Sequence, residues 1–157
     1  GDCVACLAQQ KANLEARDEK NDTALLKASD GGHADVVRAL LEAGAAVDAV
    51  GEKGWTALIW AAYRGREEAT RLLMDAGANI EAADDSGISP LLHACFQQRL
   101  PVVKMLLQAG ADIHRVDSKE GDGVILRASG DESLDVLKEL IAAGADVNQA
   151  NARGSTG

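Results

Sequence analysis

Apolar and polar positions follow the period of an α-helix, and the same pattern occurs four times along the chain. In the stretch DGGHADVVRALLEAGAAVDA (30–49), apolar residues stand in pairs four positions apart, Val36-Val37 and Leu40-Leu41. This spacing places one apolar stripe along a helix. A Gly-Ala pair follows, and glycine tolerates the left-handed conformation that ends many helices. Each of the four predicted helices ends in such a pair, at Gly44, Gly77, Gly110 and Gly144.

A shorter helix is predicted ahead of each of these. The first begins in TALLKAS, and its counterparts are TALIWAA, SPLLHAC and GVILRAS. Thr23, Thr56 and Ser89 are suited to cap this helix, because a hydroxyl oxygen accepts a hydrogen bond from an unpaired backbone N–H of the opening turn. The fourth unit has Gly123 at this place and lacks the capping hydroxyl. We expect that unit to be the least firmly held.

The spacing of the pattern predicts a repeat protein. Successive Gly-Ala pairs are 33, 33 and 34 residues apart, and a fixed period of this size indicates stacked supersecondary units. The extra residue of the last step lies between Asp117 and Gly121, in a loop where an insertion costs little. One helical hairpin cannot bury its own apolar stripe, whereas stacked neighbours can. The predicted single domain (1–157) therefore comprises a partial repeat at 1–17, repeats at 18–50, 51–83, 84–116 and 117–150, and the start of a truncated repeat at 151–157.

The units resemble the ankyrin repeat family. The family pattern G-x-TPLH-x-AA…GH…VV-x-LL-x-x-GA-x-(V/I)-N is similar to this sequence along essentially its whole length. The resemblance implies an all-α solenoid, in which antiparallel helix pairs joined by β-hairpin loops form a curved stack. The chain departs from the pattern at the histidine of TPLH, so we expect these turns to depend more on apolar packing. The residues that replace the histidine are Leu26, Ile59, Leu92 and Leu126.

Both ends of the sequence continue the repeat pattern. Gly154 and Thr156 match Gly54 and Thr56, and Leu7 aligns with a core position of the later units. Neither end has the polar character of a terminal capping repeat, which solenoids need for solubility. We therefore expect the sequence to be a piece of a longer array, or to have its ends covered by another molecule.

Composition narrows the classes of partner and compartment. The 157 residues carry a formal net charge of -9, which argues against nucleic acid, because phosphate backbones are bound by clustered Lys and Arg. An acidic surface fits a basic partner segment, or serves solubility alone. The odd number of cysteines, 3, predicts a reducing intracellular compartment, with the cytoplasm first. No apolar run is long enough for direct membrane insertion, the start is not a signal peptide, and nothing in the pattern requires self-association.

No motif predicts catalysis, a metal or a cofactor. Cys3 and Cys6 form CVAC, but a second CxxC and a nearby histidine are missing, and Cys3 aligns with core positions. His93 and Cys95 are two positions apart on a helix, so they lie on different faces and cannot form a nucleophile–base pair. GEKG at 51–54 is interpreted as a hairpin tip. The chain is therefore predicted to be non-enzymatic, with no catalytic, cofactor-binding or metal site.

Recognition of a protein partner is the function that the resemblance implies, through the hairpin tips and an exposed stripe on the first helices. All four aromatic residues map to this stripe or to the adjacent hairpin, in the second and third units. Trp, Tyr and Arg dominate interface energetics when they are desolvated. Two interpretations of Trp55 and Trp60 stay open: contact with a partner, or bracing of the hairpin and the neighbouring unit. The candidate partner-binding residues are Trp55, Trp60, Tyr63, Arg64, Ile88, His93, Phe96 and Gln97.

The sequence thus predicts a protein–protein interaction module that binds its partner on the concave face and the hairpin tips. Two alternatives remain open. The array could be an architectural subunit or spacer in a large multiprotein assembly, with its ends and convex helices covered. It could also be the targeting domain of a larger enzyme. The fold hosts many recognition tasks and does not identify the partner.

Overall fold

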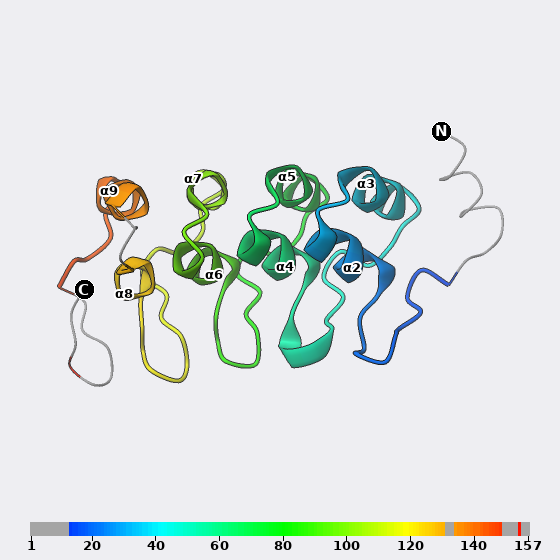
Figure 1. Cartoon of the computed structure of the whole chain (residues 1–157), viewed down its shortest axis with the longest axis horizontal. Coiled ribbons are helices and arrows are strands. Elements are labelled where there is room, and N and C mark those ends of the chain that lie inside the picture. Colours follow the sequence, from blue (N-terminus) through cyan, green and yellow to red (C-terminus); the bar gives the residue numbers. More distant parts are fainter. Residues whose placement is uncertain (1–12, 131–133, 149–153, 155–157) are drawn as a thin grey trace.

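The computed structural model describes residues 13–130, 134–148 and 154. In this part of the chain eight α-helices form and no strand, and the helices come in pairs (Figure 1). The first helices of the pairs lie side by side in one row, the second helices lie in another, and the loops project from the first row. The predicted all-α solenoid is confirmed. The helices are α2 (Ala24–Gly31), α3 (Ala34–Glu42), α4 (Ala57–Arg64), α5 (Glu67–Asp75), α6 (Pro90–Phe96), α7 (Leu100–Gln108), α8 (Val124–Ala128) and α9 (Leu134–Ala142), with a short 3-10 turn, η1 (Glu52–Gly54).

The first helices begin as the capping pattern predicts. The hydroxyl oxygens of Thr23, Thr56 and Ser89 accept from the backbone N–H three residues on, at 3.5, 3.3 and 3.4 Å. Gly123 begins α8 in the same extended conformation but offers no side-chain cap. At 5 residues α8 is also the shortest of the described α-helices.

Two arginine side chains extend from their own unit to the C-terminal end of the first helix in the preceding unit. Gly32 and Gly65 end α2 and α4 at φ 77° and 70°. A Cβ atom at either glycine would lie 2.6 Å from Cδ of Arg66 or Arg99. The Nε groups of these arginines donate to the carbonyl oxygens of Asp30 and Tyr63, both at 3.3 Å. Glycine is therefore needed twice here, for the left-handed φ and for the passage of the arginine.

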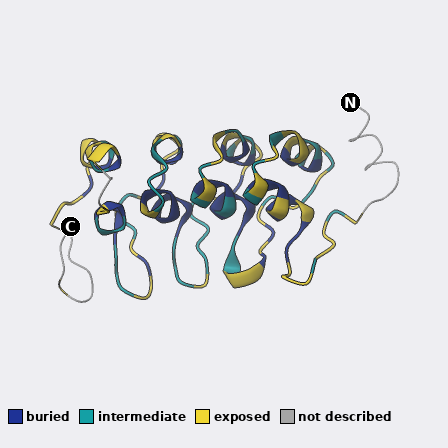
Figure 2. Cartoon of the chain, viewed as in Figure 1, coloured by how far each residue is buried: buried dark blue, intermediate teal, exposed yellow. Residues whose placement is uncertain are grey.

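Small side chains let the two rows pack closely. Ala61, Ala62 and Ala94 are fully buried between neighbouring units, and the buried residues line the junction of the two rows (Figure 2). Three of the residues that stand in for the TPLH histidine, Leu26, Ile59 and Leu92, are also 0% exposed. Apolar packing therefore does replace the histidine in three units. Leu126, in the fourth unit, is only half-buried.

The projecting loops have the form of hairpins without a β-ladder. Each is closed by one backbone hydrogen bond across its base, for example Gly51 N–H to Trp55 O at 2.9 Å and Asp84 N–H to Ile88 O at 3.1 Å. Adjacent loops are joined by a further bond, from Asp85 N–H to Lys53 O at 3.0 Å. The β-hairpins implied by the resemblance are thus present as turns, because in the described residues too few bonds join the loops for strands to form.

Some predictions fall outside the described residues. They include the CVAC motif with Cys3 and Cys6, most of the partial repeat at 1–17 and nearly all of the truncated repeat at 151–157. Among the residues that the structure does describe, no helix has both the length and the apolar character that crossing a membrane requires.

Candidate functional site

Three of the four described units carry a matching pair of an aspartate and a basic side chain where the loop meets the first helix. An aspartate at the start of the loop contacts a lysine, histidine or arginine side chain of the first helix. The pairs are Lys27 with Asp18 at 2.6 Å, His93 with Asp84 at 3.0 Å, and Arg127 with Asp117 at 2.6 Å.

The second unit breaks this rule at both positions. Gly51 stands where the other units have aspartate, and Trp60 stands where they have a base. A Cβ atom at Gly51 would overlap Oδ1 of Asp22 and Cδ2 of Leu26, so an aspartate there would require these side chains to move. The indole Nε1–H of Trp60 is buried and has no hydrogen-bond partner among the described atoms. The missing pair and the unpaired donor set the second unit apart from the other described units.

Aromatic rings gather around this exception. Trp55, just after η1, is the centre of the group: its ring centroid lies 4.3 Å from that of Trp60, 5.3 Å from Tyr63 and 4.7 Å from His93. The rings meet in tilted and edge-on arrangements, which the quadrupoles of aromatic rings favour. The guanidinium carbon of Arg64 lies 5.8 Å from the Trp60 centroid and 5.5 Å from the Tyr63 centroid.

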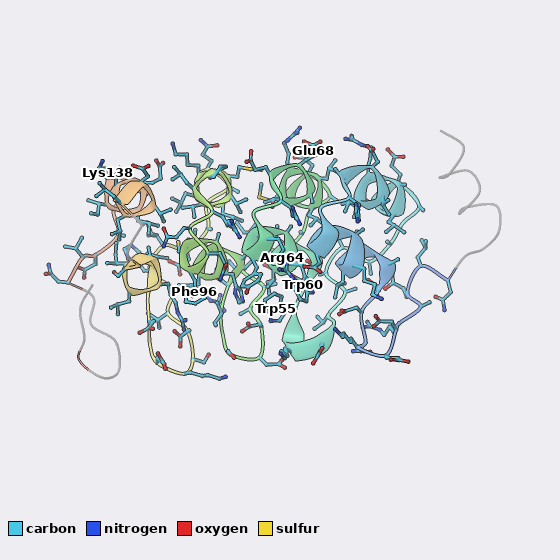
Figure 3. All side chains as sticks on the ribbon, in the orientation of Figure 1. Trp55, Trp60, Arg64, Glu68, Phe96 and Lys138 are labelled. Atoms are coloured by element: carbon cyan, nitrogen blue, oxygen red, sulfur yellow. The ribbon has the colours of Figure 1, made fainter. Side chains whose placement is uncertain are left out.

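The two tryptophans, Tyr63 and Arg64 help to line a hollow of about 310 Å³. Its apolar floor is half-buried, and charged groups form the rim: Arg64 is paired with Asp30 at 2.5 Å, Nε to Oδ1. Figure 3 shows Trp55, Trp60 and Arg64 on the loop side of the stack, away from Glu68 on the second-helix side. We call this site the Trp hollow; its lining residues are Glu52, Lys53, Trp55, Trp60, Tyr63 and Arg64.

The structure corrects the expected place of His93. Predicted to lie on the exposed stripe, this side chain is buried, with the residue 6% exposed. The physical reason is that the loop folds back over it: Asp84 bonds its Nε2, and the ring of Trp55 packs against it. Burial lowers the pKa of His93 below its ordinary value, although Asp84 acts in the opposite direction. His93 is therefore a neutral support beneath Trp55.

The remaining candidate residues lie in different environments. Ile88 is half-buried and packs against the core, and Gln97 caps the end of α6. Phe96 remains 54% exposed, but it faces the next unit, where the guanidinium carbon of Arg127 lies 5.9 Å from its ring centroid. The candidate residues therefore do not form one site.

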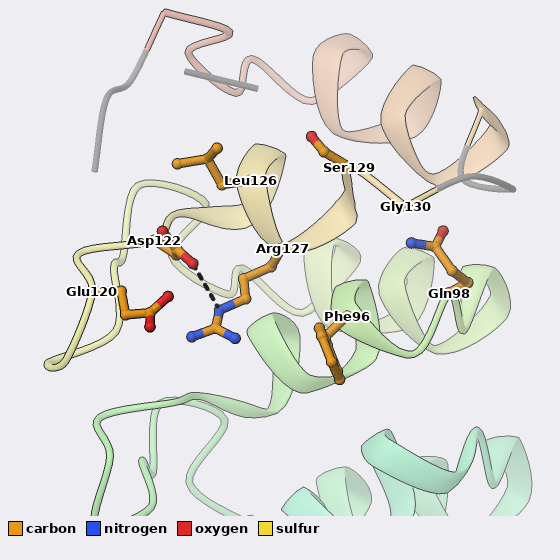
Figure 4. Close-up of a pocket in the computed structure, with 8 residues that line it drawn as sticks. All are labelled: Phe96, Gln98, Glu120, Asp122, Leu126, Arg127, Ser129 and Gly130. Carbon is orange, nitrogen blue, oxygen red and sulfur yellow. Dashed lines mark ion pairs between the residues drawn. The ribbon is translucent and has the colours of Figure 1, made fainter. Parts of the chain in front are cut away.

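Phe96 belongs to a second hollow, between the third and fourth units. Its volume is about 590 Å³, and Figure 4 shows Arg127 reaching between Phe96 and Asp122. Nε of Arg127 lies 3.8 Å from Oδ2 of Asp122. We call this site the Phe96 hollow; its lining residues are Phe96, Gln98, Glu120, Asp122, Leu126, Arg127, Ser129 and Gly130.

Sequence reasoning missed the pairing of an aspartate with a basic residue in three units, and it missed the Phe96 hollow. The signal for the first was available: aligned units show Asp, Gly, Asp and Asp at the start of the loop, and Lys, Trp, His and Arg on the first helix. The second had no signal, because the hollow depends on how far apart two helices stand.

His93 and Cys95 do not form a nucleophile–base pair in the structure. Cys95 is 0% exposed, and burial raises the pKa of its thiol to about 12, so it is held as an unreactive thiol. His93 and Asp84 bond each other, and the reactive thiolate that a nucleophile–base pair would need does not form at Cys95. No group of three or more metal-ligating side chains occurs among the described residues.

The sequence matches two family models of ankyrin repeats. The family model of ankyrin repeats in three copies matches residues 43–117, and the model of the single ankyrin repeat matches residues 20–52. Together the two matches span 20–117, which is more than half of the chain. No curated protein matches the sequence.

Proposed function

The chain belongs to the ankyrin repeat family, whose members are generally protein–protein interaction modules, and we propose that it binds a partner protein at the Trp hollow. The bound surface would be the face expected to be concave, made of the first helices and the loop tips. The module would be non-enzymatic, as the family typically is.

The observation that carries the proposal is the exception in the second unit. Three units pair an aspartate of the loop with a basic side chain of the first helix, and this unit has Gly51 and Trp60 there instead. Trp60 gains no hydrogen bond in return, since its indole N–H is buried and unpaired. A tryptophan that only braced the fold would be expected to satisfy that donor.

The make-up of the hollow also favours protein recognition. Tryptophan, tyrosine and arginine are the residue types most enriched among energetically dominant interface positions. Here the rings are held in place by one another and by His93 below. A pre-ordered aromatic surface loses little side-chain entropy when a partner docks, so more of the contact energy remains as affinity.

The test is a matched pair of single substitutions. Partners would be captured from an extract of the source cells with the unmodified chain, and one purified partner would then be titrated by calorimetry. Tyr63→Ala removes a ring of the hollow, and we expect it to weaken binding about tenfold or more. Arg71→Ala removes an exposed side chain of the same size class on α5 and should leave the affinity unchanged.

Circular dichroism and thermal melting of both variants would show whether either substitution unfolds the chain. The proposal is wrong if Tyr63→Ala and Arg71→Ala bind the partner equally well. It is also wrong if Tyr63→Ala and Trp60→Phe both melt far below the unmodified chain, because the rings would then serve the fold.

A further inference from the structure

The lining of the Trp hollow offers more hydrogen-bond donors than acceptors. An arginine side chain has five N–H donors, and Arg64 uses one of them, because Nε–H donates to Oδ1 of Asp30 at 2.5 Å. Its two terminal amino groups form no hydrogen bond with another described residue. Lys53 lines the same hollow and forms no ion pair in the described part of the chain. The one carboxylate among the lining residues belongs to Glu52.

The donors, and not the net charge, decide what this hollow can bind. With Asp30 counted, the cations Lys53 and Arg64 face two carboxylates, so the charges cancel. Hydrogen bonds between ionised groups are shorter than neutral ones and roughly twice as strong. A carboxylate is therefore the acceptor that the unused donors of Arg64 bind best.

Arg64 presents these donors in a fixed orientation. Its guanidinium carbon lies 5.8 Å and 5.5 Å from the ring centroids of Trp60 and Tyr63, while Asp30 of the preceding unit holds Nε. The edge that carries the two terminal amino groups can bind a carboxylate through two parallel hydrogen bonds. A donor pair that is held in place before binding loses little entropy when a ligand docks.

This open edge distinguishes Arg64 from Arg127, which also lies beside an aromatic ring. Nη2 of Arg127 donates to Oδ2 of Asp117 at 2.6 Å, so part of its edge is already occupied. In the units on either side of the second one, Gly31 and Gln97 stand at the position of Arg64. Among the described residues, the second unit alone thus combines several rings with an open guanidinium edge.

The size of the hollow leaves room for an apolar side chain beside the carboxylate. Its volume of about 310 Å³ exceeds the ~150 Å³ of a cavity that admits benzene. In an extended segment, side chains two residues apart point to the same side and are about 6.6 Å from each other. This separation is close to the 5.8 and 5.5 Å between the Arg64 guanidinium carbon and the two ring centroids. An apolar side chain on the rings and a carboxylate on Arg64 can therefore come from residues i and i+2 of one segment.

We infer that the Trp hollow receives an apolar side chain of an extended partner segment, and that Arg64 binds an aspartate or glutamate carboxylate two residues away from it. This inference rests on the proposed function and assigns it a ligand class. The net charge of -9 over the whole chain would favour a basic segment instead. Acidic and basic probes therefore separate the local site from the general charge.

Three blocked peptides of similar shape measure the preference. The ¹⁵N-labelled chain would be titrated with acetyl-Asp-Gly-Phe-Gly-Asp-amide, and with versions that carry Asn or Lys in place of both acids. The symmetrical sequence covers both chain directions, and salt at about 0.15 M limits long-range repulsion. The indole N–H signals of Trp55 and Trp60 and the amide signal of Tyr63 report binding. We expect the Asp peptide to bind about fivefold more tightly than the Asn peptide, and the Lys peptide to bind most weakly.

Matched arginine variants assign this preference to one side chain. Arg64→Gln should make the Asp and Asn peptides bind equally, while continued binding of the Asn peptide shows that the hollow is intact. Arg64→Lys keeps the charge without the planar fork and should lower the preference to about twofold. Arg38→Gln removes the same charge from α3, where Arg38 is paired with Glu68 and is about as exposed as Arg64. This control should keep the full preference.

The inference is overturned if the Asp and Asn peptides bind the unmodified chain equally, or if the Lys peptide binds most tightly. It is also overturned if no peptide shifts the signals, or if Arg38→Gln removes the preference as Arg64→Gln does. Any of these results, with Tyr63→Ala still weakening partner binding, refutes the ligand class and leaves the proposed function standing. Equal partner binding by Tyr63→Ala and Arg71→Ala refutes the proposed function itself.

Discussion

Gly123 offers a stabilising substitution whose size follows from a comparison within the molecule. It begins α8 at φ -87° and ψ -178°, close to Thr56 at -94° and 168° and Ser89 at -79° and 165°. A side chain at Gly123 therefore meets no backbone strain. In the other units the hydroxyl lies 3.3 to 3.5 Å from the capped N–H, and we expect the same bond in Gly123→Ser.

The expected gain has two parts. Serine is better than glycine at the capping position by a few tenths of a kcal/mol. Restricting the unfolded chain at a former glycine adds about 0.4 to 1 kcal/mol. The sum is about 1 kcal/mol, which would raise the melting temperature by about 3 °C in a chain of this length.

Urea unfolding followed by circular dichroism, with hydrogen exchange at Leu126, measures this change. Thr56→Gly is the mirror experiment and should lose about the same free energy. Gly123→Ala lacks the hydroxyl and should lie near the unmodified chain, because alanine is a poor cap. If Gly123→Ser is no more stable than the unmodified chain while Thr56→Gly is clearly weaker, the missing cap does not limit the fourth unit.

Three further predictions concern the core and its buried groups. Leu106→Ala should lower the free energy of unfolding by about 3 to 5 kcal/mol in urea, because the side chain is fully buried, while Gln108→Ala should change it by less than about 0.5 kcal/mol. Because burial lowers the pKa of His93, the unfolded chain binds this proton at a higher pH than the folded one, so stability should fall as the pH drops below about 6.5. His93→Gln should flatten that part of the stability–pH curve, and an unchanged slope would contradict the assignment. Cys95, with a thiol pKa of about 12, should resist iodoacetamide at pH 8 until urea unfolds the chain; peptide mass mapping would detect earlier labelling, which would contradict its burial.

Sequence reasoning predicted what is local to a unit. Caps at Thr56 and Ser89 depend on four consecutive residues, and the burial of Leu40 depends on helical spacing, so both can be predicted from a short stretch. The repeat period then predicts that the units stack, because every unit has the same apolar surface that it cannot bury by itself. The all-α solenoid needed no more than this.

The contacts between each loop and its helix could not be predicted from the sequence. Helical spacing places His93 on the same stripe as Tyr63, and only the fold of the loop shows that Asp84 and Trp55 cover it. The same spacing groups Phe96 with the other aromatic residues, although its ring lies by Arg127 of the next unit. The positions of these two rings depend on distances between units, and the sequence pattern within one unit does not determine those distances.

The central claim is that partner contact is concentrated at the Trp hollow of the second unit. Site-specific photo-crosslinking tests it most directly, with p-benzoylphenylalanine placed at Tyr63 in one preparation and at Arg71 in another, each irradiated with the purified partner. We predict a crosslinked product from position 63, mapped by mass spectrometry to an apolar stretch of the partner, and none from position 71. Crosslinks from position 71 alone, or equal yields from both positions, would contradict the claim.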